Sequence, residues 1–200
     1  MNNPLLNRDA LPSFKKISTD HVEAAIDTVL EDNRRAIDEL TKNTDTVNWD
    51  NFIEPLDDLD DVLHQTWSPV SHLNAVANEA ALRDAYNACL PKLSNYATEL
   101  GQNHALYLGY KTIADSPEYH ALSAAQRKTI DNALRDFHLA GVDLPKEKQQ
   151  RFKAIAERLS TLSAKFSDNV LDATQAWTYH THDQAELTGL PESALAQAKQ

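Results

Sequence analysis

Histidine is the residue type in this sequence that could most directly bind a catalytic metal ion. A helical H-E-x-x-H motif presents two His to a zinc ion and uses its Glu as a general base. The 200 residues contain eight His: His21, His64, His72, His104, His120, His138, His180 and His182. None is followed by Glu, and no two are four residues apart. The sequence therefore assigns no catalytic, cofactor-binding or metal-binding residue.

One pair of His has a spacing that some metal-ligand pairs share. His180 and His182 are two residues apart, so they would point to the same side of a β-strand. No Cys lies near them, and only Asp183 and Glu186 offer carboxylates. We interpret the pair as part of a strand that faces the surface or a channel, and not as a metal site.

Carboxylates gather at a second place, where four of five consecutive residues are acidic: Asp57, Asp58, Asp60 and Asp61. This density could indicate a cation site. However, the acids flank the apolar residues Leu56 and Leu59 instead of converging, and calcium loops normally contain a glycine turn. We interpret the cluster as the solvated outer face of a helix.

Cys89 is the single cysteine and a possible nucleophile. Its neighbours Tyr86, Leu90 and Leu93 form an apolar helical context. A free Cys in such surroundings behaves as a small buried hydrophobe, so we favour that interpretation over a reactive thiol.

The elements around these residues are predicted to be helices. Only four glycines occur, and apolar residues recur every three to four positions. We expect an all-α fold of long antiparallel helices with at most one short strand, near 177–182. The first follows possible caps at 18–20 and ends near 41, and the others span 49–65, 68–77, 79–101, 103–114, 123–140 and 145–175.

The last of these helices should be the longest, beginning near Pro145 and passing residue 170. One apolar stripe runs along it: Phe152, Ile155, Leu159, Leu162 and Phe166. Such a stripe normally faces a core. We therefore expect it to pack on the preceding helices, so that Leu159→Ala would cost about 2–5 kcal/mol.

The pattern divides the chain into three parts. Residues 1–17 read as an extended arm, 18–176 as the helical domain, and 177–200 as a short strand near 177–182 followed by a helix that opens at Pro191. The partner of that strand is not visible, and the final helix reaches Gln200 without a cap. We expect the chain to be a segment of a longer protein.

Charge and cysteine content exclude several classes of function. The net charge of −11 disfavours nucleic acid and anionic membranes, both of which require a basic surface. No apolar run approaches the roughly 18–20 residues of a membrane span, and the N-terminus lacks a secretory pattern. A lone cysteine is consistent with a reducing compartment, so we expect a cytoplasmic location.

Several runs resemble the N-terminal third of the thimet-oligopeptidase-like family of zinc metallopeptidases. They are 131–141 (DNALRDFHLAG), 144–152 (LPKEKQQRF), 166–174 (FSDNVLDAT), 68–74 (SPVSHLN) and 3–6 (NPLL). The resemblance covers essentially the whole chain. It implies two mostly helical halves that enclose a narrow channel, with zinc on an H-E-x-x-H helix that this sequence lacks.

By this resemblance, the chain would be a non-catalytic part of the channel wall that limits access and positions substrates. The full-length enzyme would bind zinc, and it would hydrolyse short cytoplasmic peptides, including cleaved signal peptides. The partners implied are those peptides and the missing catalytic part of the same chain. The alternative is a free-standing helical protein-interaction module without peptidase sequence.

Overall fold

The computed structural model describes residues 3–8, 11–42, 44 and 46–198. Within these residues it contains helices and no strand, which confirms the all-α prediction. The chain forms two compact units, Met1–Ser163 and Ala164–Gln200. Each unit is described separately below. The three-part division at 17/18 and 176/177 stays a prediction.

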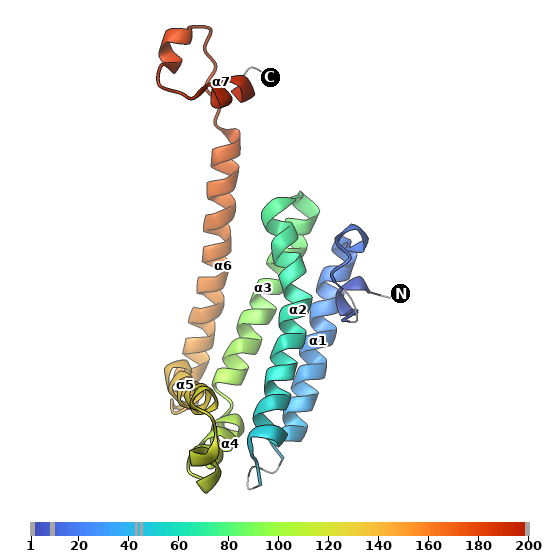
Figure 1. Ribbon diagram of the computed structural model, residues 1–200, viewed down its shortest axis with the longest axis vertical. Helices are drawn as coiled ribbons and strands as arrows, with labels where there is room; N and C mark the ends of the chain where they lie inside the picture. The colour runs from blue at the N-terminus through green and yellow to red at the C-terminus, as the bar shows by residue number, and fades with distance from the viewer. Residues whose placement is uncertain (1–2, 9–10, 43, 45, 199–200) are drawn as a thin grey trace. The chain divides into compact units, whose positions relative to one another are not determined.

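Three long helices form the centre of the first unit: α1 (Thr19–Leu40), α2 (Glu54–Val76) and α3 (Ala80–Gly101). They lie side by side, and each runs antiparallel to the one before it (Figure 1). Ser18 begins α1 with a capping box that His21 completes, and Asn48 caps the π-helical turn Trp49–Ile53 that leads into α2. These caps satisfy backbone N–H groups that a helix start leaves unpaired.

The prediction that α2 consists of two helices, 49–65 and 68–77, is wrong. A single helix continues through Pro69, although proline cannot donate the backbone hydrogen bond expected there. Pro69 and its neighbour Val70 are both buried. Their burial compensates for the lost hydrogen bond, which a sequence pattern alone does not weigh.

A shorter pair of helices completes the bundle. These are α4 (His104–Ala114) and α5 (Ala124–Ala140), joined by the 3-10 turn Pro117–Ala121. Gly141 then adopts the left-handed conformation, with φ of 88°, and ends α5 as its sequence context predicts. The core of the unit draws on all five helices and includes Ile26, Phe52, Val70, Cys89, Ile113 and Ile130.

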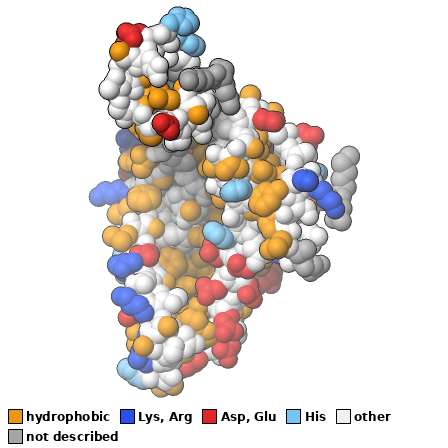
Figure 2. All heavy atoms as spheres, turned by 45° about the horizontal axis from the view of Figure 1, so that its top comes forward, with side chains coloured by type: hydrophobic (Ala, Val, Ile, Leu, Met, Phe, Trp, Pro, Cys, Tyr) orange, Lys and Arg blue, Asp and Glu red, His pale blue; other side chains and the backbone are white. Residues whose placement is uncertain are grey.

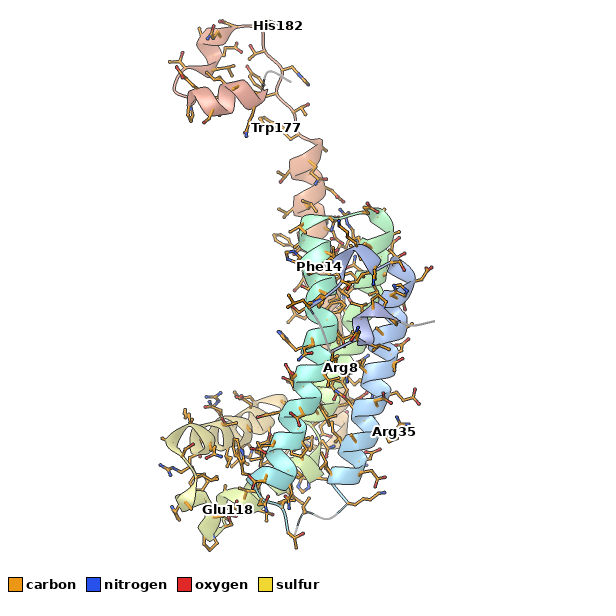
Figure 3. The ribbon with its side chains drawn as sticks, turned by 45° about the vertical axis from the view of Figure 1, so that its right-hand side comes forward. Arg8, Phe14, Arg35, Glu118, Trp177 and His182 are labelled. Carbon is orange, nitrogen blue, oxygen red and sulfur yellow. The ribbon has the colours of Figure 1, made fainter. Side chains whose placement is uncertain are left out.

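The N-terminal residues pack on this bundle. Two 3-10 turns, Pro4–Leu6 and Phe14–Lys16, interrupt the extended arm. Leu5 is buried, and the ring of Phe14 lies 5.5 Å from that of His72 on α2, centroid to centroid (Figure 3).

The longest helix is α6 (Lys146–Ala176), with 31 residues, as predicted. Its surroundings are not as predicted. The structure describes every residue of α6, and none of them is buried. Leu159 is 62% exposed and Phe166 is 70% exposed. The expectation that the stripe packs on the preceding helices is therefore wrong for this chain.

The second unit contains the end of α6, the 3-10 turn Gln184–Leu187 and α7 (Glu192–Ala198). Residues 177–182, which include the labelled Trp177 and His182, form no strand (Figure 3). A strand needs backbone hydrogen bonds to a neighbour, and the described residues provide none here. The helix that was predicted to open at Pro191 is present, whereas Gln200 lies outside the described residues.

Candidate functional site

The histidines are distributed over the chain and several have structural roles. The ring of His21 accepts a hydrogen bond from the backbone N–H of Ser18 at 3.1 Å, and His138 contacts Asp143. Within the described part of the chain, no group of three or more His, Cys, Asp or Glu side chains is arranged to hold a metal ion. His180 and His182 are both exposed.

Cys89 is completely buried, as its apolar context predicts. Burial raises the pKa of the thiol to about 11, and the negative charges of Glu23 and Asp27 act in the same direction against the charge of Lys92. The thiolate is the reactive form of cysteine. Cys89 is therefore a core residue and not a nucleophile.

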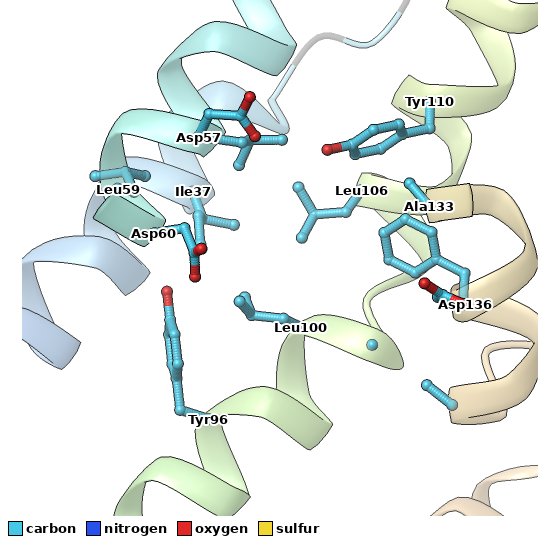
Figure 4. A pocket seen from close by; sticks show the side chains of 14 residues that line it. Ile37, Asp57, Leu59, Asp60, Tyr96, Leu100, Leu106, Tyr110, Ala133 and Asp136 are labelled. Carbon is cyan, nitrogen blue, oxygen red and sulfur yellow. The ribbon is translucent and has the colours of Figure 1, made fainter. Parts of the chain in front are cut away.

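An open hollow lies among α1 to α5 of the first unit, and we call it the bundle cavity (Figure 4). Its volume is about 380 Å³. Apolar side chains and a smaller number of polar ones line it: Ile37, Leu56, Asp57, Leu59, Asp60, Tyr96, Leu100, Gly101, Leu106, Tyr110, Ala133, Asp136, Phe137 and Ala140. Volumes of roughly 300–1,000 Å³ with a mostly apolar lining are typical of small-molecule sites.

Close helix packing forms one end of the bundle cavity. A Cβ atom added at Gly101 would lie 2.6 Å from the Cβ atom of Ala140, so the end of α3 approaches α5 more closely than other residues would allow. The Gln102 side chain donates a hydrogen bond to the Ala140 carbonyl at 3.1 Å. This contact holds the two helix ends together beside the cavity.

The acidic cluster on α2 divides between two environments. Asp57 and Asp60 line the bundle cavity, whereas Asp58 and Asp61 do not. All four are exposed, as predicted for a solvated face, but that interpretation missed the cavity beside two of them. No signal in the sequence distinguished the pairs, because Asp57 and Asp60 have the same spacing of three as Asp58 and Asp61.

Electrostatics near the cavity are dominated by negative charge. Burial raises the pKa of Asp57, and the nearby carboxylates of Asp60, Asp58 and Glu54 raise it further. Burial also raises the pKa of Tyr110 to about 12, with Asp57 and Asp60 adding to the effect. On the face shown in Figure 2, acidic side chains gather in one band beside exposed apolar ones.

A second candidate surface is the exposed stripe of α6, which consists of Ile155, Leu159, Leu162, Phe166 and Val170. Each of these side chains is at least 45% exposed. An isolated exposed apolar side chain is ordinary, but a continuous row along one helix is typical of an interaction surface. We call this row the α6 stripe.

The fold and these surfaces define a helical domain, and comparison with known proteins identifies its family. Residues 26–149 match the family model "Neurolysin/Thimet oligopeptidase, N-terminal domain". The chain belongs to the thimet oligopeptidase family, as its sequence runs suggest.

Among curated proteins, the chain is similar to oligopeptidase A of Escherichia coli, with 50% identity over the whole chain and 29% of the relative. It is 33% identical to a probable cytosolic oligopeptidase A of Arabidopsis thaliana, over 97% of the chain and 28% of that protein. An organellar oligopeptidase A, chloroplastic/mitochondrial, of the same plant is 34% identical over 97% of the chain and 24% of that protein. The chain thus spans between 24% and 29% of the length of these relatives.

Proposed function

We propose that this chain forms the N-terminal, non-catalytic segment of a zinc metallo-oligopeptidase. The observation that carries the proposal is the match to oligopeptidase A over the whole chain, within a domain that precedes most of the relatives' length. In the longer protein, the segment would form part of a channel wall, where it limits access and positions short peptides. Cleaved signal peptides would be among the substrates.

The chemistry of peptide hydrolysis supports placing the zinc site outside these 200 residues. A zinc peptidase needs three protein ligands around an open metal position, with a carboxylate base beside the bound water. The sequence has no H-E-x-x-H, and the donors in the described residues do not fit a metal ion. No residue of this chain is therefore assigned to the zinc or to the hydrolytic step.

Location in the cytoplasm is part of the same proposal. A plant relative carries the word cytosolic in its name, although another is described as chloroplastic/mitochondrial. None of the helices in the described residues is long and apolar enough to cross a membrane. Fractionation of cells with an antibody to this chain would test the location.

A peptidase assay tests the main proposal. Residues 1–200 with added zinc should not cleave a quenched fluorescent peptide, whereas the full-length gene product should, and a chelator should abolish its activity. Chelator-sensitive cleavage by residues 1–200 would contradict the proposal. With the variant His180→Ala/His182→Ala as the control for a contaminating peptidase, loss of that cleavage would place the site at 177–182, and cleavage that survives would mean a zinc site elsewhere in the chain.

The gene sequence distinguishes this proposal from a free-standing interaction module. Translation beyond codon 200 should encode H-E-x-x-H within the next several hundred codons. Its absence from the complete reading frame would favour the module, with the α6 stripe as its binding surface.

A further inference from the structure

The α6 stripe has the spacing of a coiled-coil seam. Counted from Phe152, the apolar residues of α6 follow at intervals of 3, 4, 3 and 4: Ile155, Leu159, Leu162 and Phe166. This alternation gives a row that is narrower than the apolar face of a helix that packs on a globular core. At 1.5 Å per residue, the row from Ile155 to Val170 is about 22 Å long. A second α-helix that lies along α6 at a small angle fits a seam of this shape.

One edge of the seam carries a row of positive charge. Arg151, Arg158 and Lys165 recur every seven residues, so they lie on the same side of the stripe, and all three are exposed. None of them forms an ion pair with a residue that the structure describes. At the other edge, Ala156 and Ser163 have the same spacing and no charge. Charges that flank a seam select the partner helix, so this edge favours a helix with carboxylates along one side.

A second copy of α6 does not fit this charge pattern. In an antiparallel pair the same edges meet, so Arg158 of one copy would lie beside Lys165 of the other, and like charges repel. In a parallel pair the charged edge meets the uncharged one, and the cations stay without partners. The net charge of −11 also opposes the association of two copies. The row of cations therefore favours a helix of a different sequence.

The stripe lies outside the part of the chain that the family model covers. That match ends at Gln149, in the first turn of α6, whereas the stripe begins at Ile155. No residue of α6 is buried, so the bundle does not use its apolar side chains. The chain spans only 29% of oligopeptidase A of Escherichia coli. A later segment of a longer protein therefore fits as the partner of the stripe.

We propose that the α6 stripe is the docking surface for a helix of the same polypeptide, encoded beyond residue 200, that carries an apolar seam and a row of carboxylates. The seam covers Leu159 and Leu162, and the carboxylates pair with Arg158 and Lys165. The inference rests on the proposed function, because a chain that ends at residue 200 has no such helix. It adds which surface of this segment holds the catalytic part and which chemistry the partner has.

Thiol labelling of the full-length gene product tests whether the stripe is covered. Cys89 is completely buried, so Leu159→Cys adds an exposed thiol to residues 1–200. That thiol should react with iodoacetamide at least about tenfold more slowly in the full-length product than in residues 1–200, as followed by mass spectrometry of the peptide that contains it. Leu139→Cys on α5 is the control. Its side chain is 70% exposed, and the thiol should react at similar rates in both proteins.

Charge reversal tests the chemistry of the partner helix. In the full-length product, Arg158→Glu/Lys165→Glu should speed labelling of Leu159→Cys by about threefold or more, because attraction to carboxylates becomes repulsion. The control Lys16→Glu/Lys128→Glu makes the same change in charge on exposed residues outside α6, and it should alter the rate by less than about twofold. Circular dichroism verifies that each variant is folded.

Three results would overturn the proposal: equal labelling of position 159 in the two proteins, protection of position 139 together with position 159, or equal effects of the two double variants. Labelling of residues 1–200 that slows as their concentration rises would also overturn it, because a second copy would then cover the stripe.

The labelling does not use peptidase activity, so its failure is distinguishable from failure of the proposed function. Protection of position 159 in a product that does not cleave peptides would contradict the proposed function and support the docking helix. Peptide cleavage by a product whose position 159 stays reactive would support the proposed function and overturn the docking helix. A reading frame that stops at codon 200 would contradict both.

Discussion

Helices α1 and α6 have similar apolar spacing and opposite surroundings. In α1, Val22, Ile26, Val29 and Ile37 recur at helical intervals and all are buried. In α6, Ile155, Leu159, Leu162 and Phe166 recur in the same way and all are exposed. A pattern of this kind predicts the helix and the direction of its apolar face, but it does not identify the surface that covers the face.

The difference arises from the neighbours of each helix. The N-terminal arm, α2 and α3 all pack on α1. In the first unit, α6 is held mainly near its start, where Gln149 donates hydrogen bonds to the carbonyls of Gly141 and Val142, and Lys153 lies 3.2 Å from Glu99. Burial of apolar side chains therefore stabilises α1, whereas the apolar face of α6 contributes little to the stability of this chain.

The largest effect should come from removing an aromatic side chain from the bundle. Phe52 is fully buried, and its ring centroid lies 5.9 Å from that of Tyr110. Phe52→Ala should lower the free energy of unfolding in urea by about 3–5 kcal/mol. The matched substitution Phe166→Ala on α6 should change it by no more than about 0.5 kcal/mol. Equal losses would mean that the α6 stripe is covered in solution.

A smaller effect is expected where a helix needs glycine for close packing. A Cβ atom added at Gly109 would lie 2.2 Å from the Cζ atom of Phe52, which is too close for the buried ring to tolerate in place. Gly109→Ala should therefore destabilise the bundle by about 1–3 kcal/mol, even though Ala favours a helix by about 1 kcal/mol.

The double variant Gly109→Ala/Phe52→Leu provides the control for this packing. Leucine is shorter than phenylalanine, so the added methyl group has room in the double variant. The two substitutions should together cost less than the sum of their separate losses, as a double-mutant cycle measures. Strict additivity would show that Gly109 and Phe52 are not in contact.

Much of the fold could be predicted from local signals. The possible caps at 18–20 and the apolar spacing located most of the helices to within a few residues. Predictions that depend on what packs against a segment were wrong. The helix through Pro69, the exposure of Leu159 and the missing strand at 177–182 each depend on what packs against the segment.

The bundle cavity could not be predicted from the sequence to the same extent as the helices. In the sequence, Asp57 and Asp60 were recognised only as part of an acidic cluster. Their position at the hollow depends on how five helices pack, and the close approach of Gly101 to Ala140 has no local signature. A hollow assembled from distant segments can be recognised only in the tertiary structure.

The ion pairs that connect α6 to the bundle should have a modest, pH-dependent effect. Burial acts to raise the pKa of Glu99, but hydrogen bonds from Arg34 and Lys153 outweigh it and the pKa is lowered. Glu99→Gln should cost less than about 1 kcal/mol at pH 7, because the side chain is 40% exposed and water screens the pairs.

The sign of the pH dependence follows from that lowered pKa. The contribution of Glu99 is present above its unfolded pKa of about 4.3 and is lost as the pH falls through the lower folded value. Urea unfolding at several pH values should therefore show the native chain and Glu99→Gln converging in acid. A difference that grows as the pH falls would contradict this assignment.

The smallest expected change in stability is that of Leu159→Ala, and it tests the comparison of α6 with α1 directly. The sequence predicted a loss of about 2–5 kcal/mol for Leu159→Ala, because its position in the stripe suggested a core. Since Leu159 is 62% exposed, we now expect a change within about 0.5 kcal/mol in residues 1–200. Leu30→Ala in α1, where the side chain is 2% exposed, is the matched control and should retain the larger loss. If Leu159→Ala is nearly neutral in residues 1–200 but costs several kcal/mol in the full-length gene product, a later segment covers the α6 stripe. If it is neutral in both proteins, the stripe remains exposed in the complete protein.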